Sequence, residues 1–356
     1  MALAFYNSRR LERMSLLSTF RPTGFAKPVV LGLLALIFAF VASAGYAWYR
    51  YKNTPLSLPQ KPLDFKLNRG SGAKQLAGIL NQKGVEVSGT LLWIMSRFRG
   101  DGNQLKAGTY RLTEALTMEQ LLDKMVKGDV FQAEIRFIEG WTFAQMRREI
   151  NKNPELRHET TDLSEAELLR KIGATERSVE GLFFPSTYLF SPGSSDIDLF
   201  KQAYALMNKT LSAAWEKRAV ELPYKTPYDL LTMASIVEKE TGRESDRDKV
   251  AAVFINRLKI GMMLQSDPTT IYGMGDAYKG NIRRKDLQTD TPYNTYTRGG
   301  LTPTPISLPG KASIMAAINP APINALYFVA RGDGTSEFTS NLGDHNRAVS
   351  KYQLGK

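Results

Sequence analysis

Short segments with strand periodicity and short segments with helical periodicity alternate between residues 63 and 130. Apolar residues repeat at every second position in the former and at every third or fourth position in the latter. The predicted strands lie at 64–67 and 105–112, and the predicted helices lie at 73–82, 89–99 and 117–127. This order predicts a small α+β module at 63–130, for which the pattern supports a packing role as well as a binding role.

A second and larger domain is predicted from residue 131 to residue 356. Its predicted elements are helices at 143–150, 200–218, 228–239, 248–258 and 344–352 and a strand at 327–330. Residues 261–313 are rich in Pro, Gly, Thr, Asn and Tyr and have little periodicity. Because so long a loop inside a compact domain is usually functional, we expect the substrate site there. The predicted fold class is α+β.

Residues 28–49 contain no charged residue and form an apolar run of about 20 residues, which is the length needed to span ~30 Å of hydrocarbon. The run ends in Tyr46, Trp48 and Tyr49, and such aromatic residues are typical of a membrane interface. We predict a single transmembrane helix at 28–49. A cleaved signal peptide is the alternative, because small residues at 42–44 resemble a cleavage site.

The segment before the predicted span is a basic tail at 1–27. Five basic residues stand there against one acidic residue, so the positive-inside rule places the N-terminus in the cytoplasm. A proline-rich linker is expected at 50–62, and everything beyond it on the outer side of the cell inner membrane.

The chain carries a formal net charge of +12, which implies an anionic partner. Export leaves an anionic membrane face or a cell-wall polymer and makes nucleic acid an improbable partner. The chain has no cysteine and only two histidines, so neither a zinc site nor a disulfide framework is expected. The sequence also lacks the glycine-flanked serine of many hydrolases and the phosphate-binding loop of nucleotide triphosphatases. We expect no metal and no cofactor.

Two acidic residues flank the apolar face of the helix predicted at 228–239. On a helical wheel, Glu238 and Glu240 lie at opposite edges of the apolar stripe. Partial burial raises the pKa of a carboxyl group toward the value that a general acid needs. Periodicity does not choose between the two, and glutamates in such positions usually form surface ion pairs.

The loop region supplies hydroxyl, amide and aromatic side chains, which suit the hydroxyl groups and apolar faces of sugars. The candidate substrate-binding residues are Gln265, Asp267, Thr269, Tyr272, Tyr293, Asn294, Tyr296 and Asn319. Taken singly, each also fits an ordinary role in capping or turn formation.

Several ordered motifs resemble those of the endolytic murein transglycosylase family, also called YceG-like. They are 234–241 (Ala-Ser-Ile-Val-Glu-Lys-Glu-Thr), 253–258 (Val-Phe-Ile-Asn-Arg-Leu), 264–269 (Leu-Gln-Ser-Asp-Pro-Thr), 293–296 (Tyr-Asn-Thr-Tyr) and 317–321 (Ala-Ile-Asn-Pro-Ala). Shorter matches lie at 105–110, 139–142 and 345–346. One departure is 301–306, where the family usually has a Leu-Pro-Pro sequence.

The resemblance implies a membrane-anchored enzyme with a LysM-like module at 63–130 and a catalytic domain at 131–356. It places the catalytic glutamate at Glu238. The implied substrate is the glycan strand of peptidoglycan, and the implied outcome is the termination of nascent strands. The implied partners are the lipid bilayer and, as candidates, peptidoglycan polymerases and other wall-synthesis proteins.

The implied chemistry is lytic cleavage by one carboxyl group. Glu238 would protonate the β-1,4 oxygen between MurNAc and GlcNAc and would then accept a proton from the MurNAc 6-hydroxyl, which leaves a 1,6-anhydro end. Asp267 is a weak candidate for stabilising the cationic transition state. Glu240 is expected in a structural pair with Arg243 or Arg257, and Glu139 is expected to be a turn residue rather than a carboxylate of the cleft.

Two other classes of function fit parts of the sequence. A non-catalytic peptidoglycan-binding scaffold would keep the module and a groove but would not depend on Glu238. A muramidase that cleaves with water would need a second carboxylate, for which Asp267 is the candidate. Anhydro product ends, reducing product ends or no products separate the three classes.

Overall fold

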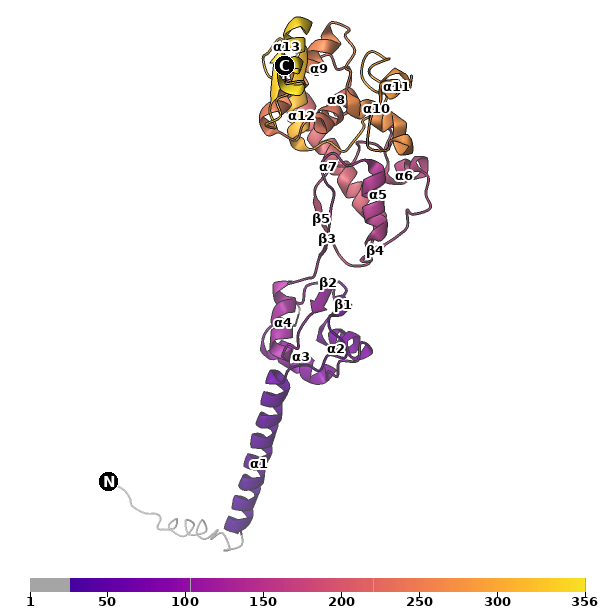
Figure 1. The fold of residues 1–356 in the computed structure, drawn as a ribbon. Coiled ribbons are helices and arrows are strands. Elements are labelled where there is room, and N and C mark those ends of the chain that lie inside the picture. The colour runs from indigo at the N-terminus through magenta and orange to yellow at the C-terminus, as the bar shows by residue number, and fades with distance from the viewer. Residues whose placement is uncertain (1–25, 103, 220, 356) are drawn as a thin grey trace, which may run out of the picture. The chain divides into compact units, whose positions relative to one another are not determined.

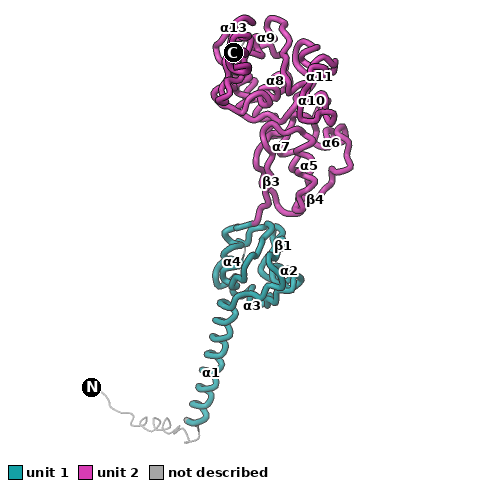
Figure 2. Tube along the Cα trace, in the orientation of Figure 1, with its two compact units in different colours: residues 1–130 teal, residues 131–356 magenta. Residues whose placement is uncertain are grey.

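The computed structural model describes residues 26–102, 104–219 and 221–355. The chain divides into two compact units, residues 1–130 and residues 131–356, which are coloured separately in Figure 2. The predicted basic tail falls outside the described residues except for its last two positions. Each unit is described by itself.

Unit 1 begins with the long helix α1 (Ala26–Asn53). In the described part of the chain it is the one helix long and apolar enough to cross a membrane. The helix does not stop where the predicted linker starts but continues to Asn53. Leu56 then packs in the core of unit 1, and its N–H donates to the carbonyl of Leu116 at 2.9 Å. The proline-containing segment is therefore packed against the sheet and helices of unit 1 that follow it in the chain.

The rest of unit 1 is a two-stranded antiparallel sheet with three helices. The strands are β1 (Leu63–Leu67) and β2 (Gly108–Leu112), and the helices are α2 (Ala73–Gln82), α3 (Gly89–Phe98) and α4 (Met118–Lys127). Alternation along β1 buries Leu63, Phe65 and Leu67, and Phe65 stacks on Tyr110 with 5.6 Å between the ring centroids. Each buried side chain of this size stabilises the unit by about 1.5–3 kcal/mol.

One end of unit 2 holds short strands and three helices (Figure 1). The strands β3 (Ala133–Arg136) and β5 (Thr187–Phe190) pair antiparallel, and β4 (Leu156–Arg157) and β6 (Ser194–Ser195) pair parallel. The helices are α5 (Phe143–Lys152), α6 (Glu165–Ile172) and α7 (Asp196–Glu216). The rings of Phe143, Phe183 and Phe200 pack together with centroids 5.3–6.1 Å apart.

The other end of unit 2 is mostly helical (Figure 1). It contains α8 (Pro227–Glu240), α9 (Glu244–Lys259), α10 (Asp267–Met274), the short 3₁₀ helix η1 (Gly275–Ala277), α11 (Arg284–Gln288), α12 (Lys311–Ile318) and α13 (Leu342–Gln353), with the hairpin of β7 (Tyr327–Ala330) and β8 (Ser336–Thr339). The region predicted as a loop at 261–313 thus contains α10, η1, α11 and the start of α12. These helices have at most eight residues, too few to establish a periodic pattern.

The central helix of this end is α8. Thr226 caps it by accepting from the N–H of Asp229, and Pro227 occupies a first-turn position that needs no N–H donor. Every residue from Leu230 to Val237 is buried, because α7, α9, α10 and α12 pack around the helix. The single apolar stripe expected from the sequence was therefore too narrow, and α8 reaches accessible space only at its two ends.

Candidate active site

Glu238 lies near the C-terminal end of α8, and its carboxylate meets the N-terminus of α12. Its Oε2 accepts from the N–H of Gly310 at 2.9 Å and from the hydroxyl of Ser313 at 2.7 Å. Gly310 is the N-cap of α12, so the carboxylate takes the place of a capping side chain. A helix N-terminus carries a partial positive charge that favours an anion. Glu238 is half-buried, so it is held in place while remaining accessible.

Gly310 also lies against a second carboxylate, that of Glu139. The backbone of Gly310 has φ −75° and ψ 170°, a conformation open to any residue. A Cβ on it would nevertheless lie 2.0 Å from Oε1 of Glu139. Any larger residue at position 310 would force the exposed Glu139 side chain to shift, so the carboxylates of Glu139 and Glu238 both lie against Gly310.

The environment of Glu139 favours retention of a proton. Burial, and then the neighbouring charge of Glu238, raise the pKa of the Glu139 carboxyl, while Arg247 opposes the shift. The sequence favoured a turn role for Glu139. The structure shows that it is both a turn residue and a neighbour of Glu238. The only hint in the sequence was its place in the Glu-Gly-Trp-Thr motif.

Backbone contacts fix the turn that carries Glu139. The N–H of Gly140 donates to the carbonyl of Leu308 at 2.9 Å, and the N–H of Leu308 donates to the carbonyl of Trp141 at 2.7 Å. The segment leading to Gly310 is also tied to α8, because the N–H of Ile306 donates to Oγ of Ser235 at 3.0 Å. These bonds hold α8, the 139–142 turn and the start of α12 together.

Glu240 occupies a different environment from Glu238. Its carboxylate accepts from the hydroxyl of Ser266, and burial raises the pKa of Glu240 to about 7. Arg257 acts on it at longer range, while its guanidinium donates to the carbonyls of Leu264 and Leu326, both at 2.6 Å. The other expected partner, Arg243, donates instead to the carbonyl of Asp333 at 3.0 Å.

Three of the candidate sugar-binding residues are exposed. Gln265 precedes α10 with φ 50° and is, within the described residues, the one residue other than glycine at positive φ. Asp267 begins α10 and accepts from the hydroxyl of the half-buried Tyr296 at 2.5 Å. Asn319 ends α12. These side chains are accessible to a ligand.

Two candidate tyrosines form an aromatic pair. The rings of Tyr272 and Tyr293 meet edge to face at 4.9 Å, and the hydroxyl of Tyr293 lies 3.0 Å from Oγ1 of Thr304. The Tyr272 hydroxyl donates to Oε2 of Glu180 at 3.1 Å, and burial raises the pKa of Glu180 to about 7. No sequence pattern singles out Glu180, because its partners Tyr272 and Phe143 are distant along the chain.

The last two candidates are buried and bonded within the loop region. Thr269 donates to the carbonyl of Ser266 at 2.7 Å. The amide nitrogen of Asn294 donates to the carbonyls of Leu287 and Thr289, at 3.0 and 2.7 Å, and its Oδ1 accepts from the N–H of Tyr296. Both side chains thus shape the loop. Over the described stretches, no group of three or more acidic, histidine or cysteine side chains is arranged to hold a metal.

Comparison with known proteins gives a consistent result. The model of the YceG-like family matches residues 65–351. A Bacillus subtilis protein named endolytic murein transglycosylase is 32% identical over 317 residues, which cover 83% of this chain and 86% of that protein. A Streptococcus pneumoniae protein of the same name is 28% identical over 369 residues, which cover 93% of this chain but 66% of its own length. The 2.6 Å crystal structure of a protein described as YceG-like from Listeria monocytogenes is 27% identical, with a TM-score of 0.50 over 81% of this chain and 98% of that one.

Proposed function

The chain belongs to the YceG-like family, and from this premise we propose that it is a lytic transglycosylase that cleaves peptidoglycan glycan strands internally. The observation that carries the proposal is the position of Glu238, which is half-buried and bound to the N-terminus of α12. A general acid must be fixed within reach of the bond that it protonates. The substrate is inferred from the names of the relatives, and the general acid is inferred from the geometry of the site.

In the proposed mechanism Glu238 acts in both steps. It first gives its proton to the β-1,4 oxygen between MurNAc and GlcNAc as the bond to C1 of MurNAc breaks. The N–H of Gly310 and the hydroxyl of Ser313 stabilise the carboxylate that remains. This carboxylate then takes the proton of the MurNAc 6-hydroxyl as its oxygen bonds to C1. The product is a 1,6-anhydro end, and Glu238 is again protonated.

Accessible groups on and just before α10, at the end of α12 and in the loop between these helices would position the sugar. Gln265, Asp267 and Asn319 offer exposed polar atoms, and Tyr272, Tyr293 and Tyr296 offer ring surface. Thr269 and Asn294 would act indirectly by holding the loop in shape. Glu139 would act beside Glu238 as a second carboxyl group.

We also propose that α1 anchors the protein in the cell inner membrane, with the N-terminus in the cytoplasm and with the rest of unit 1 and all of unit 2 outside. The apolar run within α1 and the basic residues that precede it support this placement. In unit 1, two helices lie between two paired antiparallel strands, and this order supports a LysM-like module that binds glycan. Cleavage near the membrane would terminate nascent strands, and polymerases would be the protein partners.

The experiment that tests the activity is mass analysis of the fragments that the full chain releases from purified peptidoglycan, with Glu238→Gln alongside. Anhydro-ended fragments from the native chain and none from the variant are expected. Reducing ends would overturn lytic cleavage in favour of a muramidase. A muramidase needs a second carboxylate beside Glu238, and Glu139 would be the first residue to test for that role. No fragments from either chain would favour a binding scaffold.

A further inference from the structure

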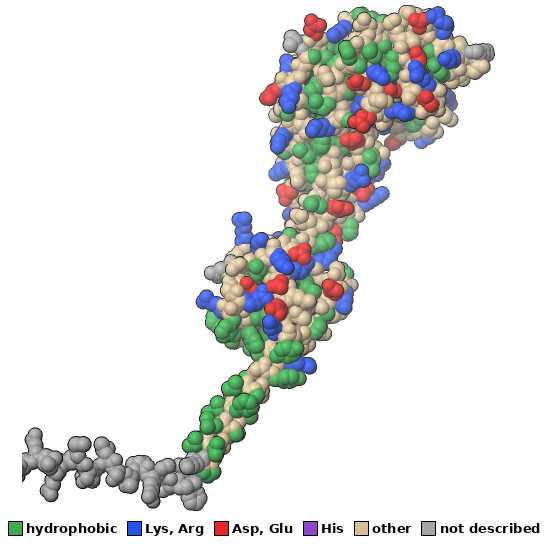
Figure 3. Space-filling view, turned by 90° about the vertical axis from the view of Figure 1, so that its left-hand side faces the viewer, with side chains coloured by type: hydrophobic (Ala, Val, Ile, Leu, Met, Phe, Trp, Pro, Cys, Tyr) green, Lys and Arg blue, Asp and Glu red, His purple; other side chains and the backbone are tan. Residues whose placement is uncertain are grey.

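An exposed aromatic side chain lies at the junction between α1 and the module at residues 63–130, which is the rest of unit 1. Phe98 ends α3 and is 84% exposed, more than any other large hydrophobic residue in the described part of the chain, α1 included. Its ring meets that of Trp48 edge to face at 6.4 Å. Figure 3 shows hydrophobic side chains gathered at the end of unit 1 from which α1 emerges.

Side-chain contacts join α1 to the rest of unit 1. The hydroxyl of Tyr51 donates to the carbonyl of Ser88, the N-cap of α3, at 3.1 Å. Lys52 pairs with Glu119 of α4 at 3.0 Å. Trp48 also packs against the core of unit 1. No free segment therefore separates the apolar helix from the module.

The length of the apolar run sets where a bilayer would end. Residues 28–49 carry no charge, and about 20 helical residues at ~1.5 Å each match ~30 Å of hydrocarbon. The first charged residue after the run is Arg50. The hydrocarbon boundary therefore falls within about one helical turn of Trp48, which is the level of Phe98.

We propose that the Phe98 end of α3 inserts into the membrane interface beside α1, so that unit 1 lies directly on the bilayer. The inference rests on the proposed anchoring by α1. Arg50 and Arg97 flank the aromatic pair and match anionic lipid headgroups in charge. Aromatic residues favour this interface. A module of this size is roughly 30 Å across, so unit 1 would handle glycan only close to the membrane.

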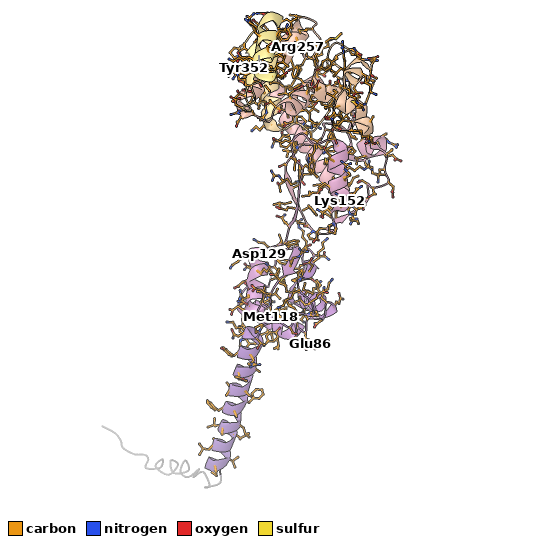
Figure 4. All side chains as sticks on the ribbon, in the orientation of Figure 1. Glu86, Met118, Asp129, Lys152, Arg257 and Tyr352 are labelled. Carbon is orange, nitrogen blue, oxygen red and sulfur yellow. The ribbon has the colours of Figure 1, made fainter. Side chains whose placement is uncertain are left out.

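The chain contains no cysteine, so one introduced cysteine carries a spin label at one known site. The full chain would be placed in vesicles of phosphatidylethanolamine and phosphatidylglycerol with a label at Phe98→Cys. Leu36→Cys, inside the apolar run, serves as the lipid control. Asp129→Cys serves as the water control, because Figure 4 places Asp129 at the end of unit 1 away from α1. Collision rates with oxygen and with a water-soluble nickel chelate are then measured for each label.

The label at position 98 is expected to have an oxygen-to-nickel collision ratio severalfold above that at position 129 and below that at position 36. If positions 98 and 129 give equal ratios while position 36 reports lipid, α1 spans the bilayer but the module does not dock, and the inference is overturned. If position 36 itself reports water, the proposed anchoring fails and the inference fails with it.

Discussion

Glu238 and Glu240 lie two residues apart on α8, yet their surroundings differ in almost every respect. Glu238 is bound by the start of α12 and stays accessible. Glu240 is bound by Ser266, and burial raises its pKa to about 7. A raised pKa alone would select Glu240 as the acid. Both side chains are half-buried, so accessibility does not separate them. The geometry favours Glu238 because the N-terminus of α12 would stabilise the carboxylate that remains after proton donation.

The comparison is tested most strongly by neutralising each acid in turn. We expect Glu238→Gln to lower the rate of glycan cleavage about 10²- to 10⁴-fold, because a general acid contributes about that much. Glu240→Gln is the matched control and should keep the rate within about threefold of native, since hydrogen bonding to Ser266 survives the change. Release of anhydro-ended fragments measures both. Equal losses in the two variants would remove the distinction.

The next largest effect on the cleavage rate is expected at Gly310, which lies against both Glu139 and Glu238. We expect Gly310→Ala to lower the cleavage rate about 10²-fold, because a Cβ there would lie 2.0 Å from Oε1 of Glu139 and would force that carboxyl group out of its position beside Glu238. The same cleavage assay applies.

The double variant Gly310→Ala with Glu139→Ala removes the clash, so its rate should return to that of Glu139→Ala alone. A Gly310→Ala enzyme as fast as native would mean that the Glu139 carboxylate is not fixed against Gly310.

The Glu240 site predicts a dependence of stability on pH. A carboxyl group whose pKa rises from 4.5 unfolded to about 7 folded stabilises the protein at low pH, and this contribution is lost as the pH rises from about 4.5 to 7. Glu240→Gln should not lose it, so the variant should gain on the order of 2 kcal/mol relative to native over that range. Urea unfolding at pH 5 and pH 8 measures the difference. Parallel pH dependence of the two proteins would contradict the assignment to Glu240.

The smallest predicted effect concerns one donor to Glu238. Ser313→Ala removes the hydroxyl that donates to Oε2 at 2.7 Å but leaves the N–H of Gly310. A hydrogen bond to a charged group is worth about 1.5 kcal/mol, so the cleavage rate should fall about tenfold. Ser307→Ala is a control for loss of a hydroxyl bonded to α8 away from Glu238. A similar loss in both would point to general loosening of the segment.

Local pattern predicted the elements of unit 1 and most long helices of unit 2, because each has enough residues to show its period. The same pattern missed α10 and α11, which are too short, and described α8 as having one buried stripe although it is enclosed. It found Glu238 and Glu240 as a pair and could not rank them. The contact of Glu139 with Gly310 joins residues far apart in sequence, and a local period carries no information about such a contact.

The backbone of Gln265 leads to a consequence for protein engineering. A left-handed conformation costs a residue with a Cβ about 1–2 kcal/mol, and glycine avoids that cost. Glycine also loses about 0.5–1 kcal/mol more in conformational entropy on folding, so Gln265→Gly would give a small net gain in stability while deleting an exposed amide beside α10. Selection for thermal tolerance alone would therefore favour glycine at position 265. Selection for cell-wall turnover would favour glutamine there if the amide holds sugar.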